Sequence, residues 1–430
     1  MSIRCALPIL CAALAAPVVH AQVLQVFPGT PTRLQEVVDA APAGAVLLVY
    51  PGDYRGLSID KPLRIVATPH PFKRVRILPR LDPAAMGVQV APLQIQGLEA
   101  GAALVLAGLD FADDPAAAAA AGERALARLS DNLGRLQFVD CRFTKALATE
   151  DGRPAVAIDD CAAAVFEACA FSGGAGAAAF AADEAHQALQ VEGARVTLLD
   201  CLLEANQPAG AGVAPALSAR QAELELARCS LVGGAGAAAL ALHGGSARLI
   251  GSPGAALRGG AAVAGLWPAG PALAADQGAQ LRLHADVLTA PGASAEGEEP
   301  TDALQLAPDV AFELVPYRAP AVDFVDSTVV AGAQVQFQLL GEPGALLLLG
   351  IAFDAQAPLA LPGIAGHLWL PPLTTGYFPV VQAVGEQPLT IAASLPANAP
   401  IGRQITAQAL QFGFGLPLEL SAPSALIVLP

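Results

Sequence analysis

The chain has 430 residues, of which 54% are hydrophobic, 5% aromatic and only 14% charged. Because soluble proteins usually carry about 25% charged residues, we expect an extensive, narrow and repetitive core, as in a solenoid. The formal net charge of −15 argues against nucleic acid as a partner, since binding a phosphate backbone requires clustered Lys and Arg.

The first 21 residues have the features of a secretory signal peptide. Arg4 precedes an apolar run, and Val19-His20-Ala21 offers modest side chains for cleavage near Ala21. The run is too short for a membrane span, and no other segment has the composition of one. We therefore expect residues 1–21 to be removed and the mature protein to be secreted or held at the cell surface.

A short helix is expected at the start of the mature chain. Thr30 suits its N-cap and Pro31 its first helical position. Apolar residues then recur at helical spacing: Leu34, Val37, Val38 and Ala41. Because the first coil of a solenoid has an open edge, we expect this helix to cap it.

Four cysteines mark a repeat. Cys141, Cys169, Cys201 and Cys229, here called the ladder cysteines, are separated by 28, 32 and 28 residues. Each has a large apolar residue three positions before it and another two positions after it. Related patterns without cysteine lie at 63–67, 104–111, 247–251 and 281–285. Short strands and bends at this period predict a β-solenoid over residues 22–290, with the ladder thiols pointing inward in one column.

A fifth mature cysteine, Cys161, lies off this column. Five is an odd number, which argues against a complete disulfide framework in a secreted protein. Cys161 is therefore either free or paired with Cys169.

The entry segment supports the solenoid. Residues 33–66, RLQEVVDAAPAGAVLLVYPGDYRGLSIDKPLRIV, resemble the start of pectin-lyase-like right-handed parallel β-helix proteins, which commonly run helix, strand, Pro-Gly-x-Tyr and Ile-x-Lys-x-Leu-x-Ile. The resemblance extends over roughly 23–290 by repeat pattern. It implies an all-β right-handed parallel β-helix, but no single activity, because the superfamily includes lyases, hydrolases, esterases and non-catalytic surface proteins.

The remainder of the chain has a different pattern. Residues 291–312, rich in Pro, small and acidic residues, are expected to form a linker, and 313–430 an antiparallel β-sandwich. Strands are expected at 333–340, 367–370, 378–384, 389–395, 404–412 and 425–429. This part is similar to C-terminal β-sandwiches on secreted proteins of environmental bacteria. Trp369, Tyr377 and Phe378 could stack on sugars, although core packing is the favoured interpretation.

Candidate site residues stand ten and nine positions before the ladder cysteines. These positions hold Asp131 and Asn132, Asp159 and Asp160, Val191 and Glu192, and Ala219 and Arg220. Since adjacent coils lie about 4.8 Å apart, we expect Asp131, Asp159, Asp160 and Glu192 to cluster on one edge.

Three interpretations of this acidic edge compete. Asp and Asn are favoured in turns with left-handed backbone, and pairs such as Arg195 with Glu223 and Asp200 with Arg228 indicate that stacked charges are common here. Alternatively, the four carboxylates hold Ca²⁺, the only cofactor considered.

The third interpretation is an inverting glycoside hydrolase. AIDDCAA (157–163) resembles the Asp-Asp-Cys strand of polygalacturonases, which implies Asp131, Asp159 and Asp160 as catalytic carboxylates. However, Leu129-Ser130-Asp131 stands where that family has Asn-Thr-Asp, and its Gly-His-Gly and Arg-Ile-Lys motifs are missing.

These patterns favour an extracellular role with carbohydrate. The leading prediction is a polysaccharide-binding or structural surface protein rather than an enzyme. The alternative is a hydrolase or lyase acting on acidic polysaccharide.

Overall fold

The computed structural model describes residues 22–30, 32–70, 72–81, 89–114, 125–145, 154–173, 187–205, 214–251, 255–263, 267–295, 301–356, 358–372, 375–381, 388–413 and 415–429. Within these ranges the chain is almost entirely β, and its one helix is α1 (Arg33–Ala40). No helix among the described residues is long and apolar enough to cross a membrane. The predicted signal peptide, residues 1–21, lies outside the described residues. Two compact units form, one over Gln22–Leu314 and the other over Val315–Pro430.

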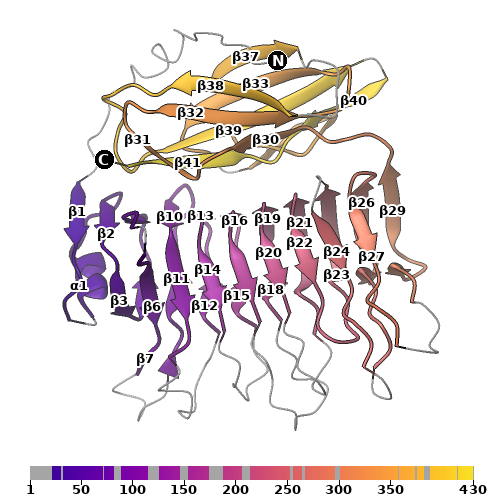
Figure 1. The fold of residues 1–430 in the computed structure, drawn as a ribbon, viewed down its shortest axis with the longest axis horizontal. Coiled ribbons are helices and arrows are strands. Elements are labelled where there is room, and N and C mark those ends of the chain that lie inside the picture. The colour runs from indigo at the N-terminus through magenta and orange to yellow at the C-terminus, as the bar shows by residue number, and fades with distance from the viewer. Residues whose placement is uncertain are drawn as a thin grey trace. The chain divides into compact units, whose positions relative to one another are not determined.

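The first unit is a stack of parallel strands (Figure 1), which fall into three ranks. The first rank contains β4 (Leu57–Ile59), β9 (Leu93–Gln96), β12 (Ala127–Ser130), β15 (Val156–Asp159), β18 (Leu189–Glu192), β25 (Leu273–Asp276) and β28 (Leu304–Leu306). The second rank contains β1 (Val23–Val26), β2 (Val46–Val49), β5 (Arg64–Ala67), β10 (Ala103–Ala107), β13 (Arg135–Val139), β16 (Ala163–Glu167), β19 (Arg195–Leu199), β26 (Gln280–His284) and β29 (Ala311–Val315). The long strands β21 (Leu217–Ala227) and β23 (Leu240–Ile250) run through both ranks and join them.

The third rank forms a separate parallel sheet. Its strands are β3 (Gly52–Arg55), β6 (Val75–Leu78), β11 (Leu109–Ala112), β14 (Arg142–Thr144), β17 (Ala170–Ser172), β20 (Leu202–Glu204), β22 (Ser230–Val232), β24 (Ala256–Arg258) and β27 (Leu288–Ala290). A short antiparallel pair, β7 (Arg80–Leu81) and β8 (Gln89–Val90), lies outside the stack's ranks. Large parallel sheets with almost no helix are consistent with a β-solenoid.

Inward side chains at equivalent positions of successive repeats stack into columns, and these columns form the core. Parallel pairing sets Phe138 against Phe166, and their rings stack at 4.5 Å between centroids. Phe143 stacks between Phe111 and Phe171 at 5.0 and 5.1 Å. Because in-register pairing repeats each inward side chain at the strand spacing, narrow apolar residues fill the interior of the stack.

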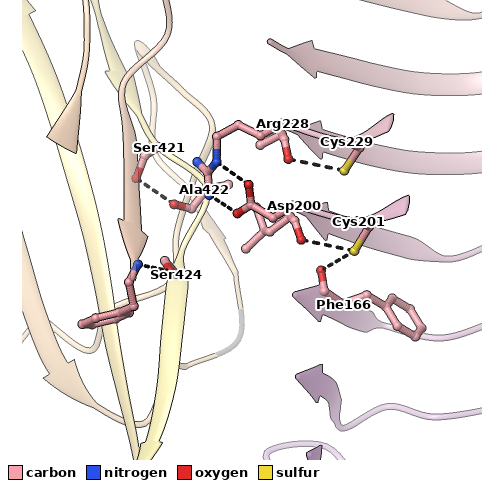
Figure 2. Close-up of polar contacts among 11 residues, drawn as sticks. Phe166, Asp200, Cys201, Arg228, Cys229, Ser421, Ala422 and Ser424 are labelled. Carbon is pink, nitrogen blue, oxygen red and sulfur yellow. Dashed lines mark hydrogen bonds and ion pairs between the residues drawn. The ribbon is translucent and has the colours of Figure 1, made fainter. Parts of the chain in front are cut away.

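The ladder cysteines occupy successive repeats, as predicted. The residues directly after them pair in register from strand to strand: Arg142, Ala170, Leu202 and Ser230. All four thiols are buried and free. Cys201 Sγ donates to the backbone oxygens of Leu199 and Phe166, at 3.2 and 3.3 Å (Figure 2). These contacts support the interpretation of the ladder cysteines as small core residues.

The residue before each ladder cysteine has left-handed backbone. These residues are Asp140, Ala168, Asp200 and Arg228. Arg228 Nε also donates to Asp200 Oδ1 of the preceding repeat at 2.8 Å (Figure 2). Arg195 Nε likewise contacts Glu223 Oε2 at 2.7 Å. Stacked charge pairs are therefore a general feature of the repeats, as predicted.

Helix α1 covers the first repeat but begins later than expected. Its apolar residues Leu34 and Val38 are buried, and it packs against β1, β3 and β4. The helix starts at Arg33 with Thr32 at the N-cap position, although the sequence suggested Thr30 there. Thr32 Oγ1 donates to Glu36 Oε1 at 2.8 Å instead of capping the backbone. Pro31 is outside the described residues.

The expected linker at 291–312 is contradicted by the strand pairing. Leu304 and Leu306 of β28 pair in register with Leu273 and Ala275 of β25, so the stack continues beyond 290. The Ala311 amide donates to Ala279 O at 2.9 Å, which adds β29 as well. Residues 301–312 therefore belong to the stack and not to a linker.

The second unit has two main sheets. One contains β30 (Ala321–Phe324), β32 (Gln334–Leu340) and β38 (Leu389–Ser394). The other contains β31 (Thr328–Val330), β33 (Leu346–Phe353), β35 (Ile364–Ala365), β37 (Gly376–Val381), β39 (Gln404–Gly413), β40 (Leu416–Leu420) and β41 (Ser424–Leu429). A short pair joins β34 (Leu359–Ala360) to β36 (His367–Leu368).

The pairing in this unit is mixed. Most strands are antiparallel, as expected, but β31 pairs with β41 and β35 with β40 in parallel. Both main sheets contribute to one core, with Phe337 from one and Leu349 from the other. Trp369 is 1% exposed, which confirms core packing for this residue, whereas Tyr377 is exposed. The side chain of Phe378 is outside the described residues.

Candidate ligand-binding groove

The acidic side chains lie where strands of the first rank end. Pairing aligns Ser130, Asp159, Glu192 and Arg220 in one column. The next position along each strand forms a second column: Asp131, Asp160, Gly193 and Gln221, all with positive φ, at 54°, 50°, 59° and 47°. Asp tolerates this backbone because its short side chain can bond locally, so the local fold favours Asp at these turns.

This alignment corrects the register read from the sequence by one residue. Asp131 lies level with Asp160, whereas counting back from the ladder cysteines had set it level with Asp159. The physical reason is turn length. Residues 131–134 separate β12 from β13, 160–162 separate β15 from β16, and only 193–194 separate β18 from β19. Counting back from the ladder cysteines crosses these turns of unequal length, so it misaligns the first-rank strands that precede them.

Gly193, in the second column, lies close to the side chain of Asp160 in the preceding repeat. A Cβ added at Gly193 would come within van der Waals overlap of Asp160 Oδ1, and its φ of 59° is the left-handed conformation that glycine favours. One repeat earlier, Gln96 Nε2 donates to Asp131 Oδ2 at 3.2 Å. Asp131 and Asp160 are both exposed at these turns.

Asn132 and Cys161 lie beneath this surface. Asn132 is fully buried, donates from Nδ2 to Ile95 O at 3.0 Å, and accepts at Oδ1 from the Leu98 amide at 3.1 Å. Cys161 is free and buried, with its sulfur 3.5 Å from Asn132 Nδ2, so it does not pair with Cys169. Burial raises the pKa of the Cys161 thiol, which therefore stays protonated at neutral pH.

The four predicted site residues converge on one surface groove of about 550 Å³. Strands β4, β9, β12, β15 and β18 and the turns that follow supply its lining: Ser58, Gln94, Ile95, Gln96, Arg128, Ser130, Asp131, Asp159, Asp160 and Glu192. The clustering expected from coil spacing thus occurs, although over two columns.

The outward column of residues beside the carboxylates was not predicted from the sequence. Ser58, Gln94 and Arg128 pair in register as the second residues of β4, β9 and β12. Period-two alternation within LQIQ (93–96) and ARLS (127–130) could have identified them, because every second side chain of a strand shares a face.

The electrostatics single out Asp159. Its pKa is raised, chiefly because partial burial disfavours the charged form; Arg128 opposes the rise, while Glu192, Asp160 and Asp131 add repulsion. Asp159 is therefore a groove carboxyl that holds a proton to higher pH than usual. Hydroxyl and amide groups, one guanidinium and carboxylates line the groove.

A metal site is not preformed in the part of the chain that the structure describes. No three His, Cys, Asp or Glu side chains among these residues gather closely enough to hold an ion. Binding of Ca²⁺ by Asp131, Asp159, Asp160 and Glu192 would require these side chains to move together.

No family model matches this chain. No curated protein matches it either. A crystal structure of an alginate lyase from Paenibacillus sp. str. FPU-7 is similar at 9% identity, over 68% of this chain and 98% of that one, with a TM-score of 0.33. A tailspike protein from Acinetobacter baumannii bacteriophage Fri1, a capsular polysaccharide depolymerase, is similar at 10% identity, over 95% and 87% of the two chains, with a TM-score of 0.18. These similarities assign neither a family nor an activity to this chain.

Proposed function

We propose that this is a secreted protein that binds polysaccharide in the groove. The observation that supports the proposal is the in-register alignment of Ser58, Gln94 and Arg128 beside the carboxylate columns. Hydroxyl, amide and guanidinium groups in a groove can form the convergent hydrogen bonds that fix a sugar's orientation. Repetition along the stack suits a polymer, because successive repeats present such groups at a regular interval.

The proposal includes the finer features of the chain. Residues 1–21 are cleaved near Ala21 during export, the stack closes into a right-handed parallel β-helix of the pectin-lyase-like type, and the second unit is a β-sandwich. The inward columns and the helix over the first repeat support the solenoid. The core shared by the two C-terminal sheets supports the sandwich.

A polysaccharide array probed with mature protein, residues 22–430, tests the binding proposal. We expect retention on at least one polymer, and loss of retention in a Gln94→Ala/Arg128→Ala variant. Arg142→Ala is the matched control, because Arg142 is exposed on β14 and outside the groove lining. No retention on any polymer would favour a structural surface protein, and retention that survives the double substitution would place the ligand elsewhere.

Cleavage of the polymer is a second candidate function, favoured by Asp159. A carboxyl with a raised pKa beside other carboxylates can act as the general acid of an inverting hydrolase, with a neighbour as base. We would measure reducing ends and unsaturated products on polyuronides and neutral glycans. Activity that is lost in both Asp159→Asn and Asp131→Asn would establish this function, whereas binding without any product supports a binding module.

Calcium binding by Asp131, Asp159, Asp160 and Glu192 has a separate test. A cation that binds only the folded state raises the unfolding temperature by mass action. Because no preformed cluster exists among the described residues, we expect millimolar Ca²⁺ to leave this temperature unchanged. A rise that disappears in Asp159→Asn/Asp160→Asn would instead show that these carboxylates share a cation.

A further inference from the structure

The two ends of the stack differ in how far their core residues are exposed. At the first repeat, Val26, Leu47 and Val49 are at most 1% exposed, because β1 pairs with β2 and α1 packs against β1. At the last repeat, Phe312 is 41% exposed and Leu314 is 58% exposed. The core is therefore covered at its start and open at its end.

Both exposed side chains belong to inward columns. The Ala311 amide donates to Ala279 O, and Glu313 Oε2 lies 3.6 Å from Arg282 Nε, which sets Glu313 level with Arg282. Phe312 and Leu314 therefore continue the columns of Leu281 and Leu283, which are only 2% and 5% exposed. In every earlier repeat such positions are covered by the next strand, so β29 has the surface of a strand that lacks its neighbour.

The outward column beside them ends on an acidic residue. Earlier in this column Arg248 contacts Glu225 at 2.5 Å, and at its end Arg282 contacts Glu313. Glu313 remains 64% exposed at its side chain. Asp302 and Asp309 of the same repeat are also exposed. A further strand would face Glu313 with its outward side chain, where a cation is favourable and a carboxylate is not.

We propose that β29 docks an extended, basic segment of a partner protein as an additional strand. Alternate apolar side chains of that segment cover Phe312 and Leu314, and a Lys or Arg between them faces Glu313. Backbone hydrogen bonds along β29 supply affinity, and the side-chain pattern supplies specificity. A second copy of this chain is the poorer occupant, because its own Glu313, Asp302 and Asp309 would meet the same carboxylates.

The test uses mature protein and two blocked, labelled peptides. One alternates Val with Lys and the other alternates Val with Glu, so both have the same apolar pattern. By fluorescence anisotropy we expect saturable binding of the Lys peptide, and binding of the Glu peptide that is weaker by about tenfold. The Glu313→Lys variant should reverse this preference, and Phe312→Ser/Leu314→Ser should abolish binding of both peptides.

Controls separate docking from general attraction to an acidic protein. Val330→Ser removes an apolar side chain of similar exposure, 51%, in the other unit and should leave binding unchanged. Glu313→Lys alters an exposed side chain, so this variant remains informative if the double Ser variant fails to fold. Equal affinity for both peptides, a preference unchanged in Glu313→Lys, or dimerisation of the protein that depends on Phe312 would overturn the proposal.

Discussion

The stacked repeats and the C-terminal unit use β-strands in different ways. In the stack each strand pairs with the equivalent strand of the next repeat, as Phe138 does with Phe166. In the C-terminal unit Thr328 pairs with Ile427 and Gln334 with Ser394, across unequal stretches of sequence and in opposite orientations.

This difference shows why one region has a visible sequence pattern and the other does not. Each position of a stack meets the same environment in every repeat, so similar residues recur at a fixed period. In a mixed sheet each strand meets its own neighbours, so alternation indicates strands without indicating their partners.

The largest expected effect is a loss of stability, compared between the core of the stack and the core of the C-terminal unit. Phe143→Ala should destabilise by about 3–5 kcal/mol, and by about 1 kcal/mol more than Phe337→Ala, because aromatic contacts add to burial. Phe143 stacks between two rings, whereas Phe337 meets Phe324 edge-on at 5.9 Å. Urea unfolding of each variant measures the difference.

Thiol labelling tests whether the stability lost in Phe143→Ala is lost in the stack. All five cysteines of residues 22–430 lie in the stack and are buried, so reagent uptake in urea reports its opening. Phe72→Ala is the control, because Phe72 is 90% exposed and its loss should leave the unfolding midpoint unchanged. Equal costs for Phe143→Ala and Phe337→Ala would contradict the proposed advantage of stacked columns.

A smaller effect is expected from glycine substitutions at two positions of the same repeat, one in a turn and one in a strand. Asp160 has a φ of 50°, so Asp160→Gly should stabilise by up to about 1 kcal/mol by removing the side chain's penalty in left-handed backbone. Ala157, in the interior of β15, is the comparison site: Ala157→Gly should destabilise by about 0.5–1 kcal/mol, because glycine weakens a strand interior relative to alanine. Thermal unfolding of both variants at one pH tests this. The same sign for both would show that the turn does not constrain Asp160.

The smallest effect is a pH dependence at Asp159. Its folded-state pKa lies above the ordinary value, so the native state holds this proton more tightly and loses stability as pH rises through the two values. Asp159→Asn should therefore be more stable than the natural protein at neutral pH, and this advantage should vanish below the ordinary carboxyl range. Denaturant midpoints across acidic to neutral pH provide the measurement. A stability difference that does not vary with pH would contradict the raised pKa.

The candidate site was predictable in part. Carboxylates in adjacent coils were expected from the repeat, and Asp131, Asp159, Asp160 and Glu192 do share one groove. Arg128 was missed, because its neighbours Gln94 and Ala157 differ from it and no repeated residue marks their column. A groove is formed by side chains that vary between repeats, whereas a core is formed by side chains that recur.

The sequence by itself determined the inward columns of the stack, including the ladder cysteines and the helix over the first repeat. These features follow from short-range patterns, since every repeat must bury the same face against the next. Only the tertiary structure decided the register of the acidic residues and the end of the stack. Because the turns differ in length, residues counted back from one strand do not align with their partners in the strand before it. The Pro-rich, acidic composition of 291–312 is that of a linker, yet strand pairing adds β28 and β29 to the stack.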